Sequence, residues 1–354
     1  TRTPLWTGGI DGTMDRIHET GIVGSLRWWY EAVVRGLGGK ACDPTAENGC
    51  EYKPKNESPP EEQLCPVCYV FGATGWRRRF RVEGPVWWNE QRSLTFRPFL
   101  LPDNLNEEDL WQTLLLTMRI ISEVGGLGAR TQQGYGVVDM EVGDYRLDVD
   151  RAFDAFDKLK RRHNRRGVNR SGLPSLDKFF FAKARFKLSD DTNPADWLKG
   201  RASDIRPNDG LEWYLRGNNA GMSVLPIAPV VRYHLRQMIR QARDRRVFSH
   251  PVRHRLMGKQ GRKSLIHISH AYLIGNGFWE FRIWGWVPDD LEGVSRKKVL
   301  NRLKGWLGVS REGEWEEVEG GEGTLWEKLN LTGVRVWWRE VGDVRGFVGG
   351  IMNI

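Results

Sequence analysis

Residues 125–136 have the sequence Gly-Gly-Leu-Gly-Ala-Arg-Thr-Gln-Gln-Gly-Tyr-Gly, a glycine-rich loop that carries a single arginine. Residues 106–124 before it begin with Asn and three acidic residues and then repeat apolar side chains every three to four positions, which predicts a capped helix. Residues 137–142 after it alternate as a strand does. The loop thus joins a helix to a strand. Nucleotide-binding P-loops and dinucleotide fingerprints join a strand to a helix, so neither fits this context.

The glycines of this loop favour a binding role, because without Cβ atoms consecutive backbone N–H groups can face one side and approach an extended anion closely. Arg130 would supply the positive charge. A flexible, solvent-exposed connection is the alternative interpretation. The candidate binding residues in the loop are Gly126, Gly128, Arg130, Gln132, Gly134 and Tyr135.

The length and charge of the chain point to two domains with a nucleic-acid partner. The 354 residues exceed one small core, and the formal net charge of +9 is concentrated in basic runs at 158–170 and 232–263. Each run alone could equally be a solvated face. Residues 312–322 are acidic, and their role stays open.

We find no apolar run of about 20 residues and no secretory leader, so we expect a cytoplasmic protein without a membrane partner.

All four cysteines fall within 27 residues, at Cys42, Cys50, Cys65 and Cys68. The Cys-Pro-Val-Cys pair forms a knuckle that points two thiolates at one metal, and the two upstream cysteines complete a tetrahedral set. Structural zinc fits best, since four thiolates leave no open position for catalysis. Two disulfides, or a redox Cys-x-x-Cys pair, are the alternatives.

Secondary-structure patterns predict an α+β protein. The first half shows strand, helix, two strands, helix and strand, at 1–6, 25–36, 77–82, 93–100, 106–124 and 137–142, with Ser25 as the cap of the first helix. The second half repeats this order less clearly, at 179–188, 226–239, 264–274, 277–287, 294–307 and 334–340. We therefore expect two tandem ferredoxin-like (βαββαβ, RRM-like) domains, 1–148 and 149–354, with a cysteine-rich insertion at about 40–70 in the first.

Four segments resemble one protein family: Thr3–Gly9, Gly24–Trp29, Cys65–Cys68 followed by Phe71-Gly72, and Gly125–Gly136. Together they resemble the RAMP superfamily of CRISPR proteins, and within it the first RAMP subunit of the type III-B Cmr effector complex. The resemblance covers about residues 1–145. It implies two ferredoxin-like domains and a place beside other Cmr subunits in a complex that carries CRISPR RNA and recognises target RNA in antiviral defence. It also implies a subunit that binds RNA without cleaving it.

Basic side chains outside the loop are further candidates for contacts to RNA phosphates. They are Arg27, Arg77, Arg78, Arg79, Arg243, Arg245, Arg246, Arg253, Arg255, Lys259, Arg262 and Lys263. The sequence does not decide between guide and target RNA. The alternative function is a RAMP-type RNA endonuclease that uses His18 or the pair Asp11 and Asp15. We expect no catalysis, because these residues lack a convincing acid–base set.

Overall fold

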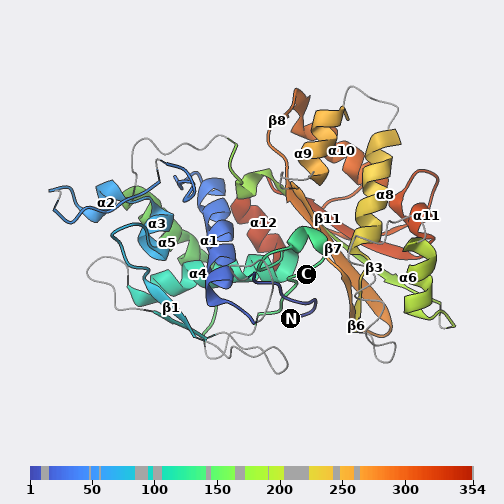
Figure 1. The fold of residues 1–354 in the computed structure, drawn as a ribbon, viewed down its shortest axis with the longest axis horizontal. Coiled ribbons are helices and arrows are strands. Elements are labelled where there is room, and N and C mark those ends of the chain that lie inside the picture. The colour runs from blue at the N-terminus through green and yellow to red at the C-terminus, as the bar shows by residue number, and fades with distance from the viewer. Residues whose placement is uncertain are drawn as a thin grey trace.

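The computed structural model describes residues 1–8, 16–47, 49–55, 57–83, 95–98, 106–140, 145–163, 172–189, 191–202, 223–241, 248–258 and 264–352. The chain forms two halves that lie side by side, one mainly helical and one built on a large sheet (Figure 1). The predicted α+β class is confirmed.

The first half contains five α-helices and a β-hairpin within the described residues. They are α1 (Glu19–Gly36), α2 (Pro60–Gln63), α3 (Pro66–Phe71), β1 (Phe80–Glu83), β2 (Thr95–Pro98), α4 (Glu107–Val124) and α5 (Val149–Arg162), with a short 3-10 turn η1 (Thr131–Gln133) in the glycine-rich loop. Helix α4 has the predicted cap, because the Asn106 side chain accepts a hydrogen bond from the Asp109 N–H at 2.6 Å.

The start of helix α1 differs from the prediction. Ser25 was expected as its cap, yet the cap is His18, seven residues earlier, and the helix begins at Glu19. The extra turns exist because Ile22 packs with Leu5 and Ile17 in a small apolar cluster. The sequence did not predict these turns, because they contain Gly21 and Gly24 and glycine disfavours helix. The Ser25 hydroxyl instead accepts a hydrogen bond from the Gly128 N–H at 2.9 Å.

The predicted outer strands of the first half are extended segments rather than a regular ladder in the described residues. The N–H groups of Arg2 and Thr3 both donate to the Val137 carbonyl, and the Gly136 N–H donates to Pro4. The Thr3 hydroxyl accepts a hydrogen bond from the Val137 N–H at 2.9 Å. A side chain is therefore the partner of a backbone donor that would otherwise bond to a neighbouring strand. Residues 141–144 lie outside the described part.

Among its described residues, the second half is built on a seven-stranded antiparallel sheet. Its strands are β3 (Phe179–Lys187), β4 (Val224–Leu225), β5 (Ile266–Ile268), β6 (Ala271–Gly275), β7 (Phe278–Trp286), β10 (Trp315–Val318) and β11 (Val334–Glu340). The other elements are η2 (Leu176–Lys178), α6 (Pro194–Ala202), α8 (Ala228–Gln241), α9 (His250–Met257), the hairpin β8 (Asp290–Leu291) and β9 (Val294–Ser295), α10 (Arg296–Leu307), α11 (Leu325–Leu329) and α12 (Val344–Ile351).

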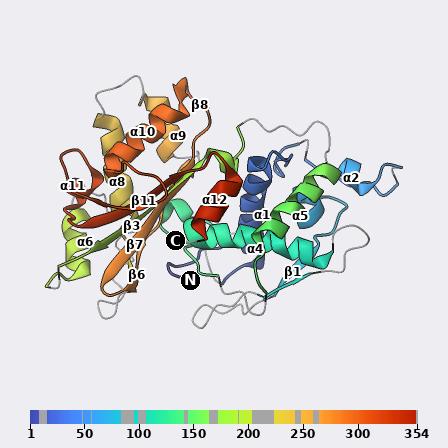
Figure 2. The same cartoon turned by 180° about the vertical axis from the view of Figure 1, so that it is seen from behind.

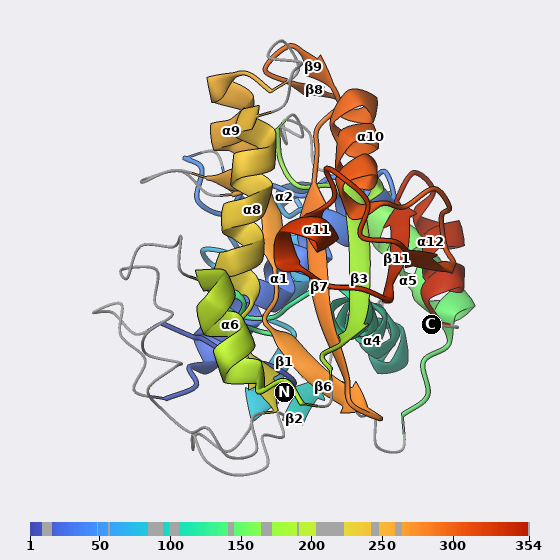
Figure 3. The same cartoon turned by 90° about the vertical axis from the view of Figure 1, so that its right-hand side faces the viewer.

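The order of the central strands is β11-β3-β7-β6, with α8 between β3 and β6 in the chain and α10 between β7 and β11. This is the split βαββαβ arrangement of a ferredoxin-like domain. Helices α6, α8, α10 and α11 cover one face of the sheet (Figure 3). Helices α4 and α12 lie against the opposite face (Figure 2).

Aromatic side chains join the two halves. The Trp29 ring of α1 lies 5.5 Å from the Phe179 ring and 6.4 Å from the Phe181 ring of β3, centroid to centroid. Phe181 also stacks on Phe347 of α12 at 5.1 Å. All four side chains are buried, so the halves share one hydrophobic core.

Helix α5 belongs by its contacts to the first half. Phe156 packs on Tyr30 of α1 with ring centroids 5.0 Å apart, and the Lys160 ammonium donates to the Leu37 carbonyl at 2.7 Å. The predicted boundary at residues 148 and 149 stays a prediction, although α5 packs with the elements that precede that boundary.

Candidate metal centre and nucleic-acid interface

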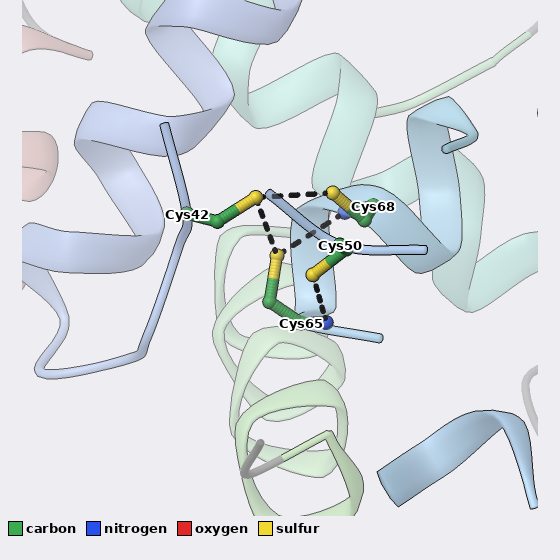
Figure 4. Close-up of side chains that lie close together, drawn as sticks. All are labelled: Cys42, Cys50, Cys65 and Cys68. Atoms are coloured by element: carbon green, nitrogen blue, oxygen red, sulfur yellow. Dashed lines mark hydrogen bonds between the residues drawn. The ribbon is translucent and has the colours of Figure 1, made fainter. Parts of the chain in front are cut away.

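The four cysteines form one buried cluster (Figure 4). Helix α3 supplies Cys68 and has Cys65 as its N-cap, while the segment after α1 brings in Cys42 and Cys50. The Sγ atoms of Cys42 and Cys68 lie 3.3 Å apart, those of Cys42 and Cys65 3.8 Å, and all four within 4.8 Å of one another. The sequence prediction that these residues converge is therefore confirmed.

The spacing of the sulfur atoms suits a tetrahedral metal. Four Zn–S bonds of about 2.3 Å place the sulfurs of an ideal tetrahedron about 3.8 Å apart, within the observed range. Two backbone amides also point at thiols, from Cys65 to Cys50 at 3.3 Å and from Cys68 to Cys65 at 3.5 Å. Such amides stabilise thiolates, so the cluster can bind a metal with sulfur ligands.

Three charged residues of α1 border the cysteine cluster. Arg27, Glu31 and Arg35 follow one another at four-residue intervals and form two ion pairs, of 3.0 Å and 3.1 Å. Arg27 donates to the Cys68 sulfur at 3.0 Å and to the Gly72 carbonyl at 2.9 Å. The structure thus places this RNA-binding candidate against the cysteine cluster.

The glycine-rich loop uses most of its backbone amides inside the protein. Leu127 donates to Gly136, Ala129 to Trp6, and Gly136 to Pro4, at 2.7–2.9 Å. The amides of residues 125, 128, 133 and 134 also have acceptors within the protein. The row of amides that the sequence predicted for phosphate binding is therefore engaged in holding the loop.

The loop glycines allow close packing at the junction of the two halves. A Cβ atom added to Gly126 would lie 2.9 Å from the Trp284 ring, and one added to Gly134 would lie 2.3 Å from the His270 ring. The Gly134 carbonyl accepts a hydrogen bond from the His270 N–H at 2.9 Å. These glycines join the loop to the sheet of the second half.

Arg130 has an aromatic neighbour at the loop surface. Its backbone is left-handed, with φ of 58°, and its guanidinium lies 3.6 Å from the centroid of the Trp6 ring. Tyr135 contacts the other rings here, at 5.7 Å from Trp6 and 5.6 Å from His270. This half-buried group combines a cation with aromatic surfaces, a combination that suits nucleic acid.

The loop is also bonded to the second half through polar side chains. The Thr131 hydroxyl and the His267 Nδ1 atom lie 2.8 Å apart, and the His267 ring stacks on Trp284. Burial, with a further contribution from the positive charge of Arg232, lowers the pKa of His267 to about 3. His267 is therefore neutral at physiological pH.

Arg232 of helix α8 connects the loop to a basic cavity. It donates to the Gln132 carbonyl at 3.3 Å and also to the Met257 carbonyl at the end of α9. Arg236, one turn further along α8, donates to the Gly258 carbonyl at 2.8 Å. The adjoining cavity has a volume of about 270 Å³ and is lined by Arg236, Gln237, Arg240, Arg253, His254 and Gly258.

Several predicted residues lie apart from this cavity. Arg77 is exposed. Arg78 donates to the Phe80 carbonyl at 2.8 Å, and Arg79 lies over Trp76 at 4.0 Å; burial lowers the pKa of both arginines. Arg255 lies 3.8 Å from Glu292.

Other predicted residues fall outside the described part of the chain. They are Asp11, Asp15, Arg243, Arg245, Arg246, Lys259, Arg262 and Lys263. His18 is described, and it stands at the N-cap of α1, where its N–H donates to the Thr7 hydroxyl at 2.8 Å.

Sequence reasoning did not single out Arg232, Arg236 and Arg240, although all three lie in the basic run at 232–263. Their four-residue spacing on one helical face was the signal that could have found them. Trp6 was assigned only to a strand, and no sequence signal pairs it with Arg130.

Residues 1–139 match the model of the RAMP superfamily. The recognition of this segment as a RAMP-superfamily region is thereby confirmed. The chain is similar to the crystal structure of Cmr1 from Pyrococcus furiosus in its apo form, with 14% sequence identity over 78% of this chain and 82% of that chain, and a TM-score of 0.36. No curated protein matches the chain. None of the helices among the described residues is long and apolar enough to span a membrane.

Proposed function

We propose that the protein is an RNA-binding subunit of a type III-B (Cmr-type) CRISPR effector ribonucleoprotein in the cytoplasm, where it contacts CRISPR RNA, target RNA or both beside other Cmr subunits. The RAMP match of residues 1–139 supports the class. The observation that carries RNA binding is the basic path from Arg130 through Arg232 to the cavity lined by Arg236, Arg240 and Arg253.

Binding along this path would be electrostatic. Arginines neutralise phosphates and release counterions, so affinity falls steeply as salt rises, while the base sequence is read by pairing to the guide. Arg130 and Trp6 would add a stacking surface at one end of the path. The glycines would hold this surface in place rather than contact phosphates through their amides.

The experiment measures RNA affinity of the purified protein against salt concentration. Arg240→Gln combined with Arg253→Gln removes two cavity arginines whose side chains have no hydrogen bond to the residues that the structure describes. We expect the slope of log K against log salt to become shallower by about 1.4, since each single-strand phosphate contact contributes about 0.7. Arg311→Gln, an exposed arginine before β10, is the matched control. An unaltered slope in the double variant would contradict the cavity as an RNA contact.

We further propose that the subunit does not cleave RNA. His18 occupies a helix cap, and catalysis by proton transfer needs at least two positioned titratable groups. Time courses with labelled guide and target RNA, with and without divalent metal, should give no product with the pure protein. Product that disappears in His18→Ala, Asp11→Ala or Asp15→Ala would establish the endonuclease instead.

The metal of the cysteine cluster is proposed to be structural zinc. Four thiol ligands fill a tetrahedral shell and leave no site for substrate. Elemental analysis should find about one zinc per chain, and disulfides in the purified protein would exclude it.

A further inference from the structure

The row Arg27, Glu31 and Arg35 has an unusual place on helix α1. Residues four apart lie on one helical face, and this face is turned into the protein. The side chains of Glu31 and Arg35 are 6% and 3% exposed, and that of Arg27 is 17% exposed. Burying three charges is costly unless each charge is paired. Two arginines and one glutamate leave one positive charge without an opposite charge in the row.

The two ends of the row hold the two segments that carry the cysteines. Arg27 donates to the Cys68 sulfur, within helix α3, and to the Gly72 carbonyl, just after that helix. Arg35 binds the carbonyls of Ala41 at 3.3 Å and Cys42 at 3.2 Å. Glu31 lies between them and accepts from both arginines. The row therefore fixes both halves of the cysteine cluster to a single rigid helix.

The charges of the row also complement a metal-loaded cluster. Four thiolates around one Zn²⁺ leave two negative charges in a buried site. Two arginines and one glutamate supply one net positive charge beside it. An N–H donor aimed at a metal-bound sulfur lowers the charge density on that sulfur further.

We propose that Arg27 and Arg35, joined through Glu31, are positioning and charge-balancing residues of the metal centre, and that Arg27 serves the metal rather than RNA. The inference rests on the proposed zinc and goes beyond the RNA-binding function. Arg35 extends the same system to the second half of the chain, because its Nη1 atom donates to the Pro174 carbonyl at 2.9 Å, shortly before β3.

The experiment compares wild type, Arg27→Gln, Arg27→Lys and the control Arg302→Gln, an exposed arginine on α10. Zinc affinity is measured on the full chain by competition with a chromogenic chelator. Cobalt is then substituted for zinc, and the thiolate-to-cobalt charge-transfer absorption is recorded, because it reports the electron density of the ligating sulfurs.

We expect Arg27→Gln to weaken zinc binding 10–100-fold, the usual effect of removing a partner of metal ligands. Its charge-transfer band should move to lower energy, since Cys68 has lost a hydrogen bond. Arg27→Lys keeps the positive charge but loses the planar guanidinium, which donates to several acceptors at once. It should therefore bind zinc more tightly than Arg27→Gln but less tightly than wild type, with the absorption band still shifted. Arg302→Gln should match wild type in both measurements.

Wild-type affinity or an unmoved band in Arg27→Gln would overturn the inference while leaving structural zinc intact. A wild-type protein that binds no zinc would overturn both. If Arg27→Gln fails to fold even in excess zinc, Arg27→Lys decides, and wild-type behaviour of that variant in affinity and absorption would reject the proposal.

Discussion

Gly128 has a backbone that other residues adopt at a cost. Its φ is 85°, and an added Cβ atom would lie 2.6 Å from the Trp6 carbonyl oxygen. Its N–H is held by the Ser25 hydroxyl. The glycine is therefore required by the fold itself, before any ligand is considered.

We expect Gly128→Ala to reduce the free energy of unfolding by roughly 1–3 kcal/mol, through backbone strain and displacement of the first segment. Gly24→Ala is the matched control, since an added Cβ there meets nothing within 4 Å and the residue is helical. The control should be neutral or stabilising by up to about 1 kcal/mol. Urea denaturation measures both, and equal stability of the two variants would contradict the strain.

His163 allows a test of how the stability of the fold depends on pH. Its ring lies 4.1 Å from that of Tyr69, and the side chain is buried. Burial lowers its pKa to about 4, with smaller contributions from neighbours that include Glu61, which acts in the opposite direction. The unfolded chain with a histidine pKa near 6.5 therefore binds a proton that the folded chain does not bind, and stability falls as pH drops from about 6.5 towards 4.

His163→Phe keeps a ring against Tyr69 and removes the titration. Between pH 7 and pH 5 the variant should lose about 2 kcal/mol less stability than wild type, at about 1.4 kcal/mol per pKa unit. Urea midpoints at both pH values measure this difference. Parallel losses in the two proteins would show that His163 does not titrate as described.

At the level of residues, the sequence predicted which cysteines converge but not what surrounds them. Cysteine spacing is a strong signal because a metal sets the geometry. Arg27 carries the same positive charge whether it faces RNA or a thiolate, and only the tertiary fold decides which. The same limit applies to the glycines, whose flexibility is visible in sequence while the acceptors of their amides are not.

Helix α4 ends against a buried arginine of the sheet. Arg282 of β7 donates to the Gly125 carbonyl at 3.2 Å, just beyond the last turn, where backbone carbonyls lack partners within the helix. It also donates to the Tyr272 hydroxyl at 3.0 Å, and Tyr272 in turn bonds Glu280. One side chain thus joins an element of the first half to two strands of the second.

We expect Arg282→Met to destabilise the protein by about 3–5 kcal/mol, because buried polar groups lose their partner. Arg335→Met, an exposed residue on β11, which β3 separates from β7, should change stability by no more than about 0.5 kcal/mol. Thermal or urea unfolding compares them. A near-neutral Arg282→Met would mean that α4 reaches the sheet through apolar contacts alone.

At the level of elements, the strongest periodic segments were predicted best. Helix α4 and strand β11 have nearly the predicted bounds, since one has a cap and acidic first turn and the other a clear alternation. The start of α1 was missed because its stabilising contact, Ile22 with Leu5, joins residues far apart in sequence. The outer strands of the first half were weakened by side-chain bonds that a pattern does not encode.

For the whole molecule, metal removal is the decisive perturbation. Zinc that binds only the folded chain stabilises it by about 2.7 kcal/mol when free zinc is 100 times Kd. For a cooperative unit of 150–250 residues this corresponds to a fall in Tm of roughly 5–10 °C on chelation. Differential scanning fluorimetry with chelator, then with zinc restored, measures it, and a Tm indifferent to chelator would contradict the proposed zinc.

The ferredoxin-like order of the second half could be predicted because its strands and crossover helices alternate along the chain. The way the halves join could not. Trp29, Phe181 and Phe347 come from three distant segments, and their pairing depends on the final packing of α1, β3 and α12.

Burial of the four thiols has a consequence for how the protein matures. Cys65 and Cys68 are 0% and 1% exposed, and Cys42 and Cys50 are 5% and 8% exposed, so the folded chain leaves an incoming ion very little access to the sulfurs. We therefore expect the proposed zinc to be captured during synthesis or during a transient local opening of the fold. Metal-free protein that has already folded should take up zinc at a rate that becomes independent of zinc concentration. The reason is that local opening of the fold, rather than collision with the ion, limits the rate.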